Sequence, residues 1–419
     1  MREAFEQAIL DDPGERSHYA AFADWLMERG DPRGEFIQVQ LALEDEGCSA
    51  DERRTLRERE KELLDRHERE WLGELAPFLL FTDPQRSEPL AARRWERGFL
   101  AEVRALCLTR AFAHALADAP AARFLRELRV QGEARYYSLD DGDRPPARVP
   151  APPGVGQHWE LLELIGARCL RNLRVFQMGD GDGEPPEEGY GDCHTYAPGL
   201  EHVVACMGRV EELHLLCKAY SPDRLFALPN LTNLRLLRLY HLGVRENQGE
   251  RDRYEYPLNA LAANPALSNL THLLFHPHMP EYHHDAYDER ERTGRQLSFL
   301  PLEQVRALLR SPHLRKLTHL QLRLSDMGDA GVRELIDSGA LSRLKWLDLR
   351  HGCISAEGAR LLADCPDARH LEHLDLSRNA VSAEGLARLH AAGVPARAES
   401  PLTPQELAGQ QYLFEGDGE

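Results

Sequence analysis

A histidine-rich stretch in the second half of the chain carries the side chains whose types and spacing come closest to metal chemistry. Imidazole and carboxylate groups are common zinc and iron ligands, and a catalytic site would use three of them and leave one position open. The spacing matches no H-E-x-x-H or comparable motif. A metal-dependent hydrolase is therefore kept as the alternative function, with His276, His278, His283, His284 and Asp285 as candidate ligands.

Signatures of other enzymes are missing from the sequence. It contains no P-loop, no G-x-S-x-G and no G-x-G-x-x-G between a strand and a helix. An acidic run from Gly179 alternates its carboxylates as calcium loops do, but from Gly183 it departs from the EF-hand pattern. Cys193 and His194 are adjacent, and adjacency alone does not make a nucleophile and its base. We predict a protein that is not an enzyme and needs no cofactor.

An internal repeat predicts the strands and helices that would position the functional side chains. The segment LKWLDLRHGCISAEGARLLAD begins at Leu344, and LEHLDLSRNAVSAEGLARLH begins 27 residues later at Leu371. In both, apolar residues follow the spacing L-x-x-L-x-L, and Ser-Ala-Glu-Gly then opens an amphipathic helix. A short strand with this pattern turns three apolar side chains inward, and each coil of chain can bury them only against its neighbours.

Six further copies of the strand pattern lie upstream. Across all eight copies the first, fourth and sixth positions supply 24 residues, and each is Leu, Val, Phe or Met. This regularity predicts a stack of strands with one continuous apolar core. The strands are expected to begin at Leu125, Leu173, Val210, Leu234, Leu270, Leu317, Leu344 and Leu371.

The extended pattern L-x-x-L-x-L-x-x-N, with Asn379 in its last position, resembles the leucine-rich repeat. Where successive strands start 27 residues apart, a helix follows each strand, which resembles the longer ribonuclease-inhibitor-like class. The resemblance extends from Arg94 to Gly393. It implies an α/β fold, a leucine-rich repeat horseshoe with parallel strands on the concave face and helices on the convex face. An N-terminal all-helical domain would precede it.

The first 92 residues contain none of the repeat, and their apolar spacing predicts helices. The run YAAFADWLMERGDPRGEFIQVQ resembles the bacterial repeat-companion domain, whose hallmark is an A-D-W-L-x-E-x-G-D-x-R-G-E-F-I core. Such domains typically precede leucine-rich repeats, and the resemblance implies a bacterial protein but no biochemical role. We interpret four residues of this run as capping and packing groups of a helical hairpin: Asp24, Trp25, Asp31 and Arg33.

The chain is predicted to have three parts. Residues 1–92 form the helical domain, 93–393 the leucine-rich repeat solenoid, and 394–419 a C-terminal cap and tail. Arg93 to Leu108 are expected to form a degenerate first strand, with Trp95 and Phe99 covering the open end of the core. Insertions rich in Pro, Gly and charge predict loops near residues 140–157, 179–192, 245–256 and 276–295.

Composition narrows the classes of partner. The formal net charge of -18 argues against a nucleic acid or an anionic membrane, because phosphate binding requires a basic face. No 18-residue apolar run and no signal-peptide pattern is found, so we expect a cytoplasmic protein without a membrane span. The eight cysteines are scattered without a C-x-x-C pair, which is typical of reduced thiols.

Residues at the third, fifth and seventh positions of each strand alternate with the buried apolar residues, so we expect them to be exposed in the concavity. Among these 24 positions, four arginines balance four acidic residues and five are histidines. From Leu234 onward the face is rich in arginine and aromatic residues, as interface hot spots are. The predicted partner contacts are Arg238, Tyr240, His272, His276, His319, Arg323, Trp346, Arg350 and His373.

These observations together predict a non-enzymatic interaction scaffold or recognition subunit. It would bind a protein partner on the concave face and on the loop edge of the repeats, with Trp346 as the central anchor. Fold alone does not fix function, so the choice depends on what these side chains do in the structure.

Overall fold

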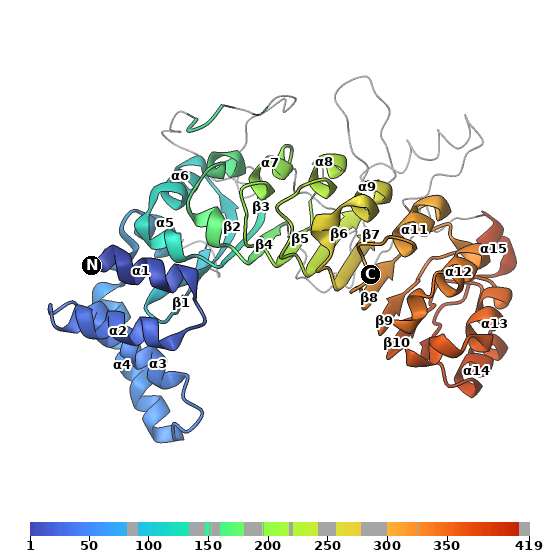
Figure 1. Ribbon diagram of the computed structural model, residues 1–419, viewed down its shortest axis with the longest axis horizontal. Coiled ribbons are helices and arrows are strands. Elements are labelled where there is room, and N and C mark those ends of the chain that lie inside the picture. Colours follow the sequence, from blue (N-terminus) through green and yellow to red (C-terminus); the bar gives the residue numbers. More distant parts are fainter. Residues whose placement is uncertain are drawn as a thin grey trace. The chain divides into compact units, whose positions relative to one another are not determined.

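The computed structural model describes residues 1–81, 91–133, 147–150, 152, 160–179, 195, 197–217, 221–241, 257–277, 300–323 and 325–409 (Figure 1). The chain divides into two compact units. The first comprises Met1–Pro150, Glu160–Val175 and Cys206–Gly208, and the second comprises Ala151–Trp159, Phe176–Ala205 and Arg209–Glu419.

Helices form the first part of the first unit (blue in Figure 1). Their shared core includes Tyr19, Phe22, Leu26 and Ile37, each no more than 1% exposed. Isolated helices of 10 to 12 residues, the lengths of the first three, are marginal in water, so burial of these apolar side chains supplies their stability. The helices are α1 (Arg2–Asp11), α2 (Arg16–Met27), α3 (Pro32–Leu43), α4 (Ala50–Leu72) and α5 (Ala76–Leu79), with the 3-10 turn η1 (Gly73–Leu75) before α5.

The junction between α2 and α3 is built by the sequence Gly-Asp-Pro-Arg-Gly. Gly30 takes a left-handed conformation, with φ of 69°, just beyond the end of α2. Asp31 caps α3, since its Oδ1 accepts from the backbone N–H of Arg33 at 3.0 Å. Gly34 packs so closely on α2 that a Cβ there would come 2.6 Å from the Ala23 carbonyl oxygen. These contacts fix the position from which the Arg33 side chain leaves α3.

The expected single strand from Arg93 to Leu108 is wrong, because this segment is a hairpin. β1 (Ala91–Glu96) pairs antiparallel with β2 (Phe99–Leu108). Arg97 and Gly98 form the turn, with φ of 48° and 82°, as a two-residue hairpin turn with positive φ at both positions requires. β2 then pairs in parallel with β3 (Glu127–Glu133). The remaining elements of this unit are α6 (Arg110–Asp118), η2 (Pro120–Phe124), η4 (Glu160–Leu164) and η5 (Cys169–Asn172).

The hairpin is tied to the helices within the same unit. Phe99 is part of the helical core, where its ring stacks on Phe22 with centroids 6.0 Å apart. The Trp95 Nε1–H donates to Glu68 at 2.8 Å, and the Gly98 N–H donates to Gln40 Oε1 at 2.7 Å. The two residues expected to cover the end of the leucine core, Trp95 and Phe99, are both buried.

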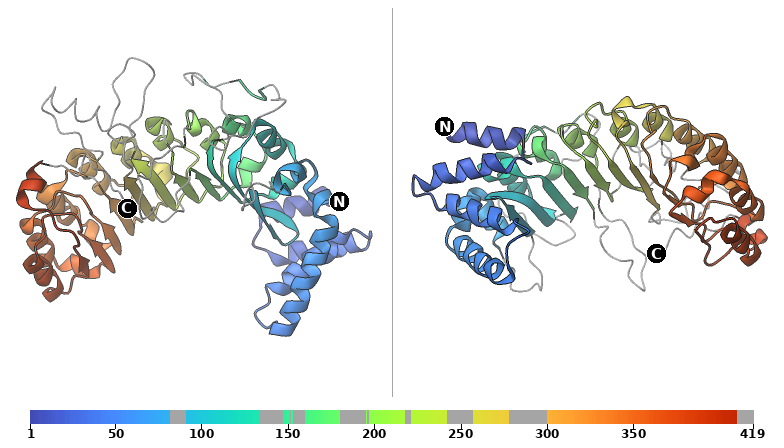
Figure 2. Two further views of the ribbon diagram at one scale, coloured as in Figure 1. Left: turned by 180° about the vertical axis from the view of Figure 1, so that it is seen from behind. Right: turned by 60° about the horizontal axis from the view of Figure 1, so that its bottom comes forward.

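Strands and helices alternate in the second unit, and Figure 2 shows the strands on one face and the helices on the other. Strands β5 to β11 are parallel, and each pairs with the next in chain order. The strands are β4 (Val175–Met178), β5 (Glu212–Leu215), β6 (Leu236–His241), β7 (His272–Pro277), β8 (His319–Leu322), β9 (Trp346–Asp348), β10 (His373–Asp375) and β11 (Ala396–Arg397). The helices are α7 (Leu200–Val204), α8 (Pro222–Phe226), α9 (Leu258–Ala263), η6 (Pro265–Leu267), α11 (Leu302–Leu309), α12 (Gly328–Asp337), η7 (Ala340–Ser342), α13 (Ala356–Asp364), η8 (Pro366–His370), α14 (Ala383–Ala391) and α15 (Pro404–Gly409).

The repeat pattern explains this arrangement. The apolar positions of successive strands are in register, so that Leu347 lies between Leu320 and Leu374, all 0% exposed. Asn379 is also fully buried, and its Oδ1 accepts from the backbone N–H groups of Gly352 and Ile354 at 3.0 and 2.8 Å. A buried amide that satisfies backbone groups of the preceding coil explains why the pattern places Asn at this position. The predicted α/β leucine-rich repeat fold with a helical N-terminal region is confirmed.

Other expectations about organisation have mixed outcomes. The predicted insertions lie almost entirely outside the described residues. The predicted domain boundary at residue 92 stays a prediction, since the first compact unit contains both the helices and the first three strands. Within the described ranges, no helix is both long and apolar enough to cross a bilayer.

Candidate functional site

The residues that begin strands β5 to β10 form one row on the strand face of the second unit. The register pairs the first residue of each strand with the first residue of the next. Neighbouring strands lie about 4.8 Å apart, so side chains within the row can touch. In order, the row contains Glu212, Leu236, His272, His319, Trp346 and His373.

The last four side chains of this row, His272, His319, Trp346 and His373, stack as one ladder, which we call the aromatic row. Ring centroids are 3.9 Å apart for the two histidines His272 and His319, with an angle of 17° between the planes. Trp346 lies 6.5 Å from His319 and 5.4 Å from His373, at 21° and 10°. All four residues are partly buried, so the stack keeps an accessible surface. Rigid aromatic surface of this kind is typical of binding sites.

Two threonines orient the histidines. Thr271 Oγ1 lies 2.8 Å from His272 Nδ1, and Thr318 Oγ1 lies 2.9 Å from His319 Nδ1. Each hydroxyl also donates to a backbone carbonyl, at 3.0 and 3.2 Å. A hydroxyl has a single proton, so the imidazole Nδ1–H must be the donor in the other contact. In this tautomer Nε2 of each ring is left as a hydrogen-bond acceptor.

The environment favours uncharged rings. Burial lowers the pKa of His272 and of His319, against a weaker opposing effect of Glu212 on the first. The His272 ring lowers the pKa of His319 further, because two imidazolium ions in contact would repel. Glu372 and Lys345 act on His319 in opposite directions. The histidine pair is therefore uncharged at neutral pH and presents flat, apolar ring surface.

A group of charged residues lies beside the aromatic row, and its charges are neutralised inside the fold: Arg323, Asp348, Arg350 and Asp375. Asp348 is 0% exposed, and its Oδ2 accepts from Arg323 Nε at 3.0 Å. Arg350 donates to the same oxygen at 2.9 Å and lies 3.6 Å from Asp375. The expectation that Arg323 is exposed is wrong, because Asp348 holds its guanidinium in the interior, where the residue is 4% exposed. Arg350 remains partly buried.

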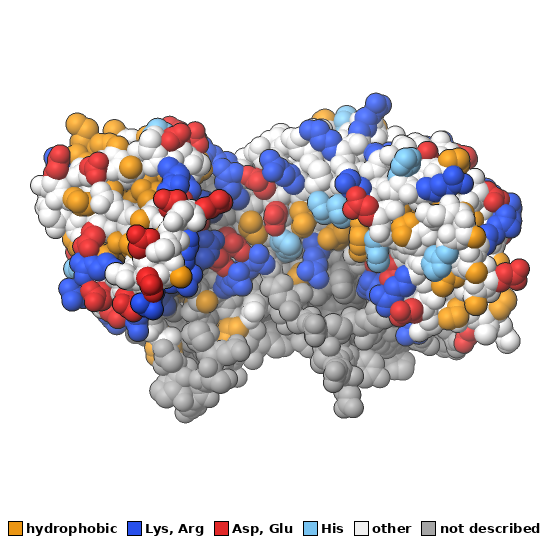
Figure 3. Space-filling view, turned by 90° about the horizontal axis from the view of Figure 1, so that it is seen from below, with side chains coloured by type: hydrophobic (Ala, Val, Ile, Leu, Met, Phe, Trp, Pro, Cys, Tyr) orange, Lys and Arg blue, Asp and Glu red, His pale blue; other side chains and the backbone are white. Residues whose placement is uncertain are grey.

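The remaining predicted contacts have different outcomes. Arg238 is partly buried on β6, in register with His214 on one side and Leu274 on the other. Tyr240 and His276 belong to β6 and β7, but their side chains lie outside the described residues. Figure 3 shows histidines (pale blue) on one face of the molecule, with arginine, lysine and carboxylate groups among them. One exposed pair beside the aromatic row joins Lys345 to Glu372 at 2.9 Å.

The metal hypothesis is not supported by a described site. His278, His283, His284 and Asp285 lie outside the described residues, as does the side chain of His276. In the described part of the chain, no group of three or more His, Cys, Asp or Glu side chains could hold a metal ion.

Sequence reasoning missed the threonines. Thr271 and Thr318 directly precede β7 and β8, at the second position of the repeat pattern. This position is neither one of the apolar positions nor one of those expected to be exposed in the concavity. The signal was present, because the tetrapeptide Leu-Thr-His-Leu occurs at both Leu270 and Leu317. A threonine that recurs directly before a histidine indicates that its hydroxyl can orient the imidazole ring through a hydrogen bond.

A comparison with family models agrees with the repeat pattern. A family model described as "Leucine Rich repeat" matches residues 313–335 and 367–389. Among solved structures, a leucine-rich repeat protein of Leptospira interrogans matches with 12% sequence identity and a TM-score of 0.21, over 70% of this chain and 76% of that chain. No curated protein matches the chain.

Proposed function

We propose, from the premise that this chain is a leucine-rich repeat protein, that its second unit is a non-enzymatic binding module. Its strand face would hold a protein partner, and the chain would act as a scaffold or recognition subunit in the cytoplasm of a bacterium. Leucine-rich repeats generally mediate protein-protein interaction, so the repeats support the class of function. The aromatic row supports the choice of surface.

The observation that carries this proposal is the stack of His272, His319, Trp346 and His373. A core packed only for stability would turn such rings inward, whereas these four share the face opposite the leucines and stay partly exposed. Trp346 lies between two histidines that hold its ring parallel to theirs. A preordered tryptophan loses little conformational entropy on binding, which favours affinity.

The chemistry of the surface defines the partner. Burial lowers the pKa of His272 and His319 and so favours their uncharged rings, and beside them Arg323 and Arg350 are neutralised by Asp348 and Asp375. A surface of flat rings, beside charged groups that are already paired with one another, suits aromatic or aliphatic side chains of a partner. Donors such as a backbone N–H could bind Nε2 of His272 or His319. We therefore expect an apolar peptide segment rather than a strongly charged one.

Peptides selected from a displayed random library on the full-length protein would test this function. The selected sequences, synthesised with amidated C-termini, are expected to bind Trp346→Ala at least about tenfold more weakly than wild type, because truncation of a central interface tryptophan has effects of this size. Trp346→Phe should give an intermediate loss, since it retains a ring in the stack.

The matched control is Arg360→Ala, an exposed side chain on α13 on the helix face of the same unit. Its peptide affinity should equal that of wild type. Selected peptides that bind Trp346→Ala as tightly as wild type would place recognition elsewhere on the molecule and contradict the proposal.

A further inference from the structure

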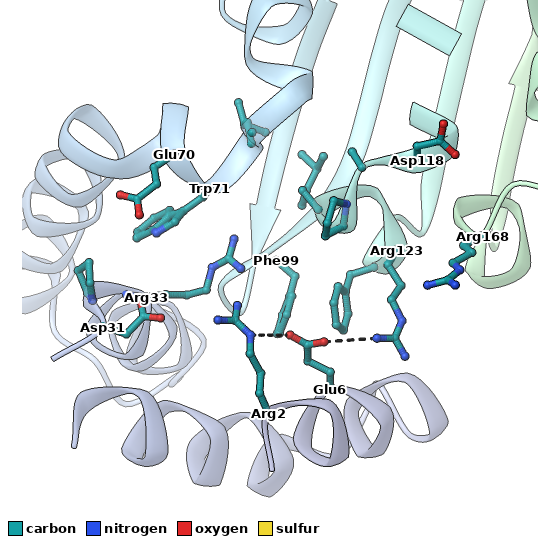
Figure 4. A pocket seen from close by; sticks show the side chains of 18 of the residues that line it. Arg2, Glu6, Asp31, Arg33, Glu70, Trp71, Phe99, Asp118, Arg123 and Arg168 are labelled. Atoms are coloured by element: carbon teal, nitrogen blue, oxygen red, sulfur yellow. Dashed lines mark hydrogen bonds and ion pairs between the residues drawn. The ribbon is translucent and has the colours of Figure 1, made fainter. Parts of the chain in front are cut away.

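A cavity of about 590 Å³ lies in the first unit, within the size range of pockets that bind small molecules (Figure 4). It is lined by α1, by the junction of α2 and α3, by the end of α4, by the start of β2 and by the segment that follows α6. None of the strand-face residues of the second unit contributes to it.

Arg33 extends into this cavity from the first turn of α3, as Figure 4 shows. Its Nε is buried without a hydrogen-bond partner, and its guanidinium forms no ion pair with any described residue. Three aromatic rings lie 5.5, 5.7 and 5.8 Å from the guanidinium carbon, those of Trp71, Trp95 and Phe99. Such rings attract a cation, but they offer no strong acceptor to its five N–H groups.

This arrangement is unfavourable for a positive charge. Burial lowers the pKa of Arg33 to about 10, and the positive charge of Arg2 acts in the same direction. Two acidic residues lie two positions from Arg33 in the sequence. Asp31 uses its carboxylate to cap α3, and Glu35 pairs with Arg59 at 2.7 Å. A buried charge without a hydrogen-bonded counterion is costly, so a purely structural position would favour an apolar residue or an acidic partner.

The other charges around the cavity are largely committed. Glu6 forms ion pairs with Arg2 at 3.0 Å and with Arg123 at 3.3 Å, and Figure 4 shows it between them. Arg168 also lines the cavity, is exposed, and forms no ion pair with a described residue. The carboxylates of Asp118 and Glu70 belong to exposed residues. The partly buried cation that still lacks an acceptor among the described residues is therefore Arg33.

We propose that this cavity binds a carboxylate with an apolar body, the two carboxylate oxygens accepting from the Arg33 guanidinium and the body lying against Trp71 and Phe99. The planar fork of arginine matches a carboxylate with two parallel hydrogen bonds. Arg33 is the one of the two unpaired arginines that is shielded from bulk water, and a single guanidinium calls for a single negative charge, which favours a monocarboxylate over a phosphate dianion. The aromatic walls favour an apolar body on the ligand.

Two sources could supply such a group, a free organic acid or the C-terminal carboxylate of a peptide. Calorimetric titration of the full-length protein would use 3-phenylpropanoate and its neutral amide as one pair. The dipeptide Ala-Phe with a free or an amidated C-terminus would be the second pair, and inorganic phosphate the fifth probe. At least one carboxylate should bind saturably and at least about tenfold more tightly than its amide, because hydrogen bonds to charged groups contribute on this scale. The pair that binds more tightly identifies the source.

Substitutions of Arg33 test whether its guanidinium binds the carboxylate. Arg33→Met should abolish carboxylate binding, and Arg33→Lys should weaken it, because lysine keeps the charge but loses the planar fork. The matched control is Arg54→Met, which removes an exposed arginine of α4 in the same unit and should bind as wild type does. The Arg33→Lys result keeps the test decisive if Arg33→Met does not fold.

Several results would overturn the proposal. These are equal affinity for a carboxylate and its amide, unchanged binding by Arg33→Lys and Arg33→Met, tighter binding of phosphate than of either carboxylate, and no saturable binding of any probe. None of these outcomes depends on the strand face, so a failure here leaves the proposed protein-binding function intact.

Discussion

Two arginines, one in each unit, have opposite surroundings. Arg323, in the second unit, donates to the carboxylate of Asp348 at 3.0 Å, and both residues are almost fully buried. Arg33, in the first unit, has three aromatic rings around it and no ion pair with a described residue. The first is a structural group whose charge is balanced inside the fold. The second has unused donors that face a cavity, which is why we infer a ligand there.

The same contrast explains which surface of the second unit is available. Because Arg323 and Arg350 both bind Asp348, the charged residues of the strand face interact mainly with each other. The rings of the aromatic row, in contrast, stack on one another, and no ring contact with a residue outside the row is found among the described residues. Recognition on this face is therefore expected to depend on Trp346 and its neighbours more than on the arginines.

Removal of the shared carboxylate should have the largest effect on stability. Asp348→Ala would remove the buried carboxylate that Arg323 and Arg350 both bind, and should lower the free energy of unfolding by about 4 kcal/mol. Urea denaturation followed by circular dichroism would measure this loss. Asp364→Ala on α13, whose ion pairs with Arg360 and Arg388 are exposed, should leave the midpoint nearly unchanged. Equal losses from the two variants would show that the buried pair is no different from an exposed one.

The two arginines should respond in opposite directions to the same substitution. Arg323→Met should destabilise the second unit by about 3 kcal/mol, because Asp348 loses one of its buried counterions. Arg33→Met should stabilise the first unit by about 1 kcal/mol in the absence of ligand, because it removes a partly buried charge that lacks a counterion among the described residues. Amide hydrogen exchange in α2, α3 and strands β8 to β10 would resolve the two units separately. Destabilisation by Arg33→Met would mean that its cation–π contacts outweigh the burial cost.

The smallest expected effect concerns pH. Burial lowers the pKa of His272 and His319 in the folded protein, so the unfolded chain binds their protons first as the pH falls. Their contribution to stability is complete above the unfolded pKa of about 6.5 and decreases as the pH drops below it. His319→Phe keeps the stack but removes one titrating group, so its stability should fall less steeply between pH 6.5 and 5. Parallel curves for variant and wild type in urea titrations would contradict this assignment.

Much of the fold could be predicted because its signals are local. The spacing of Leu344, Leu347 and Leu349 specifies a strand with one buried face, and a second copy 27 residues later provides the neighbour against which it packs. The alternation of a strand then places Trp346 and His373 on the opposite face, and their exposure follows. The hairpin turn at Arg97 was missed because arginine rarely adopts positive φ, so only the following glycine signals the turn.

Exposure within the strand face could not be predicted from position alone. Arg323 and Trp346 both occupy positions that alternate with buried leucines, yet one is covered and the other is accessible. The difference arises because Asp348, on the next strand, lies within hydrogen-bond distance of Arg323. Nothing near Arg323 in the sequence indicates which neighbour its guanidinium will find.

The sequence by itself determined the repeat, the register of its strands and the row that contains the histidines and Trp346. The reason is that the alternation along each strand and the recurrence of L-x-x-L-x-L from strand to strand are properties of the order of side chains. Only the tertiary structure decided that Arg323 is neutralised and that Arg33 is not. The partners of a long charged side chain come from segments distant in the chain, and their distances exist only once the chain has folded.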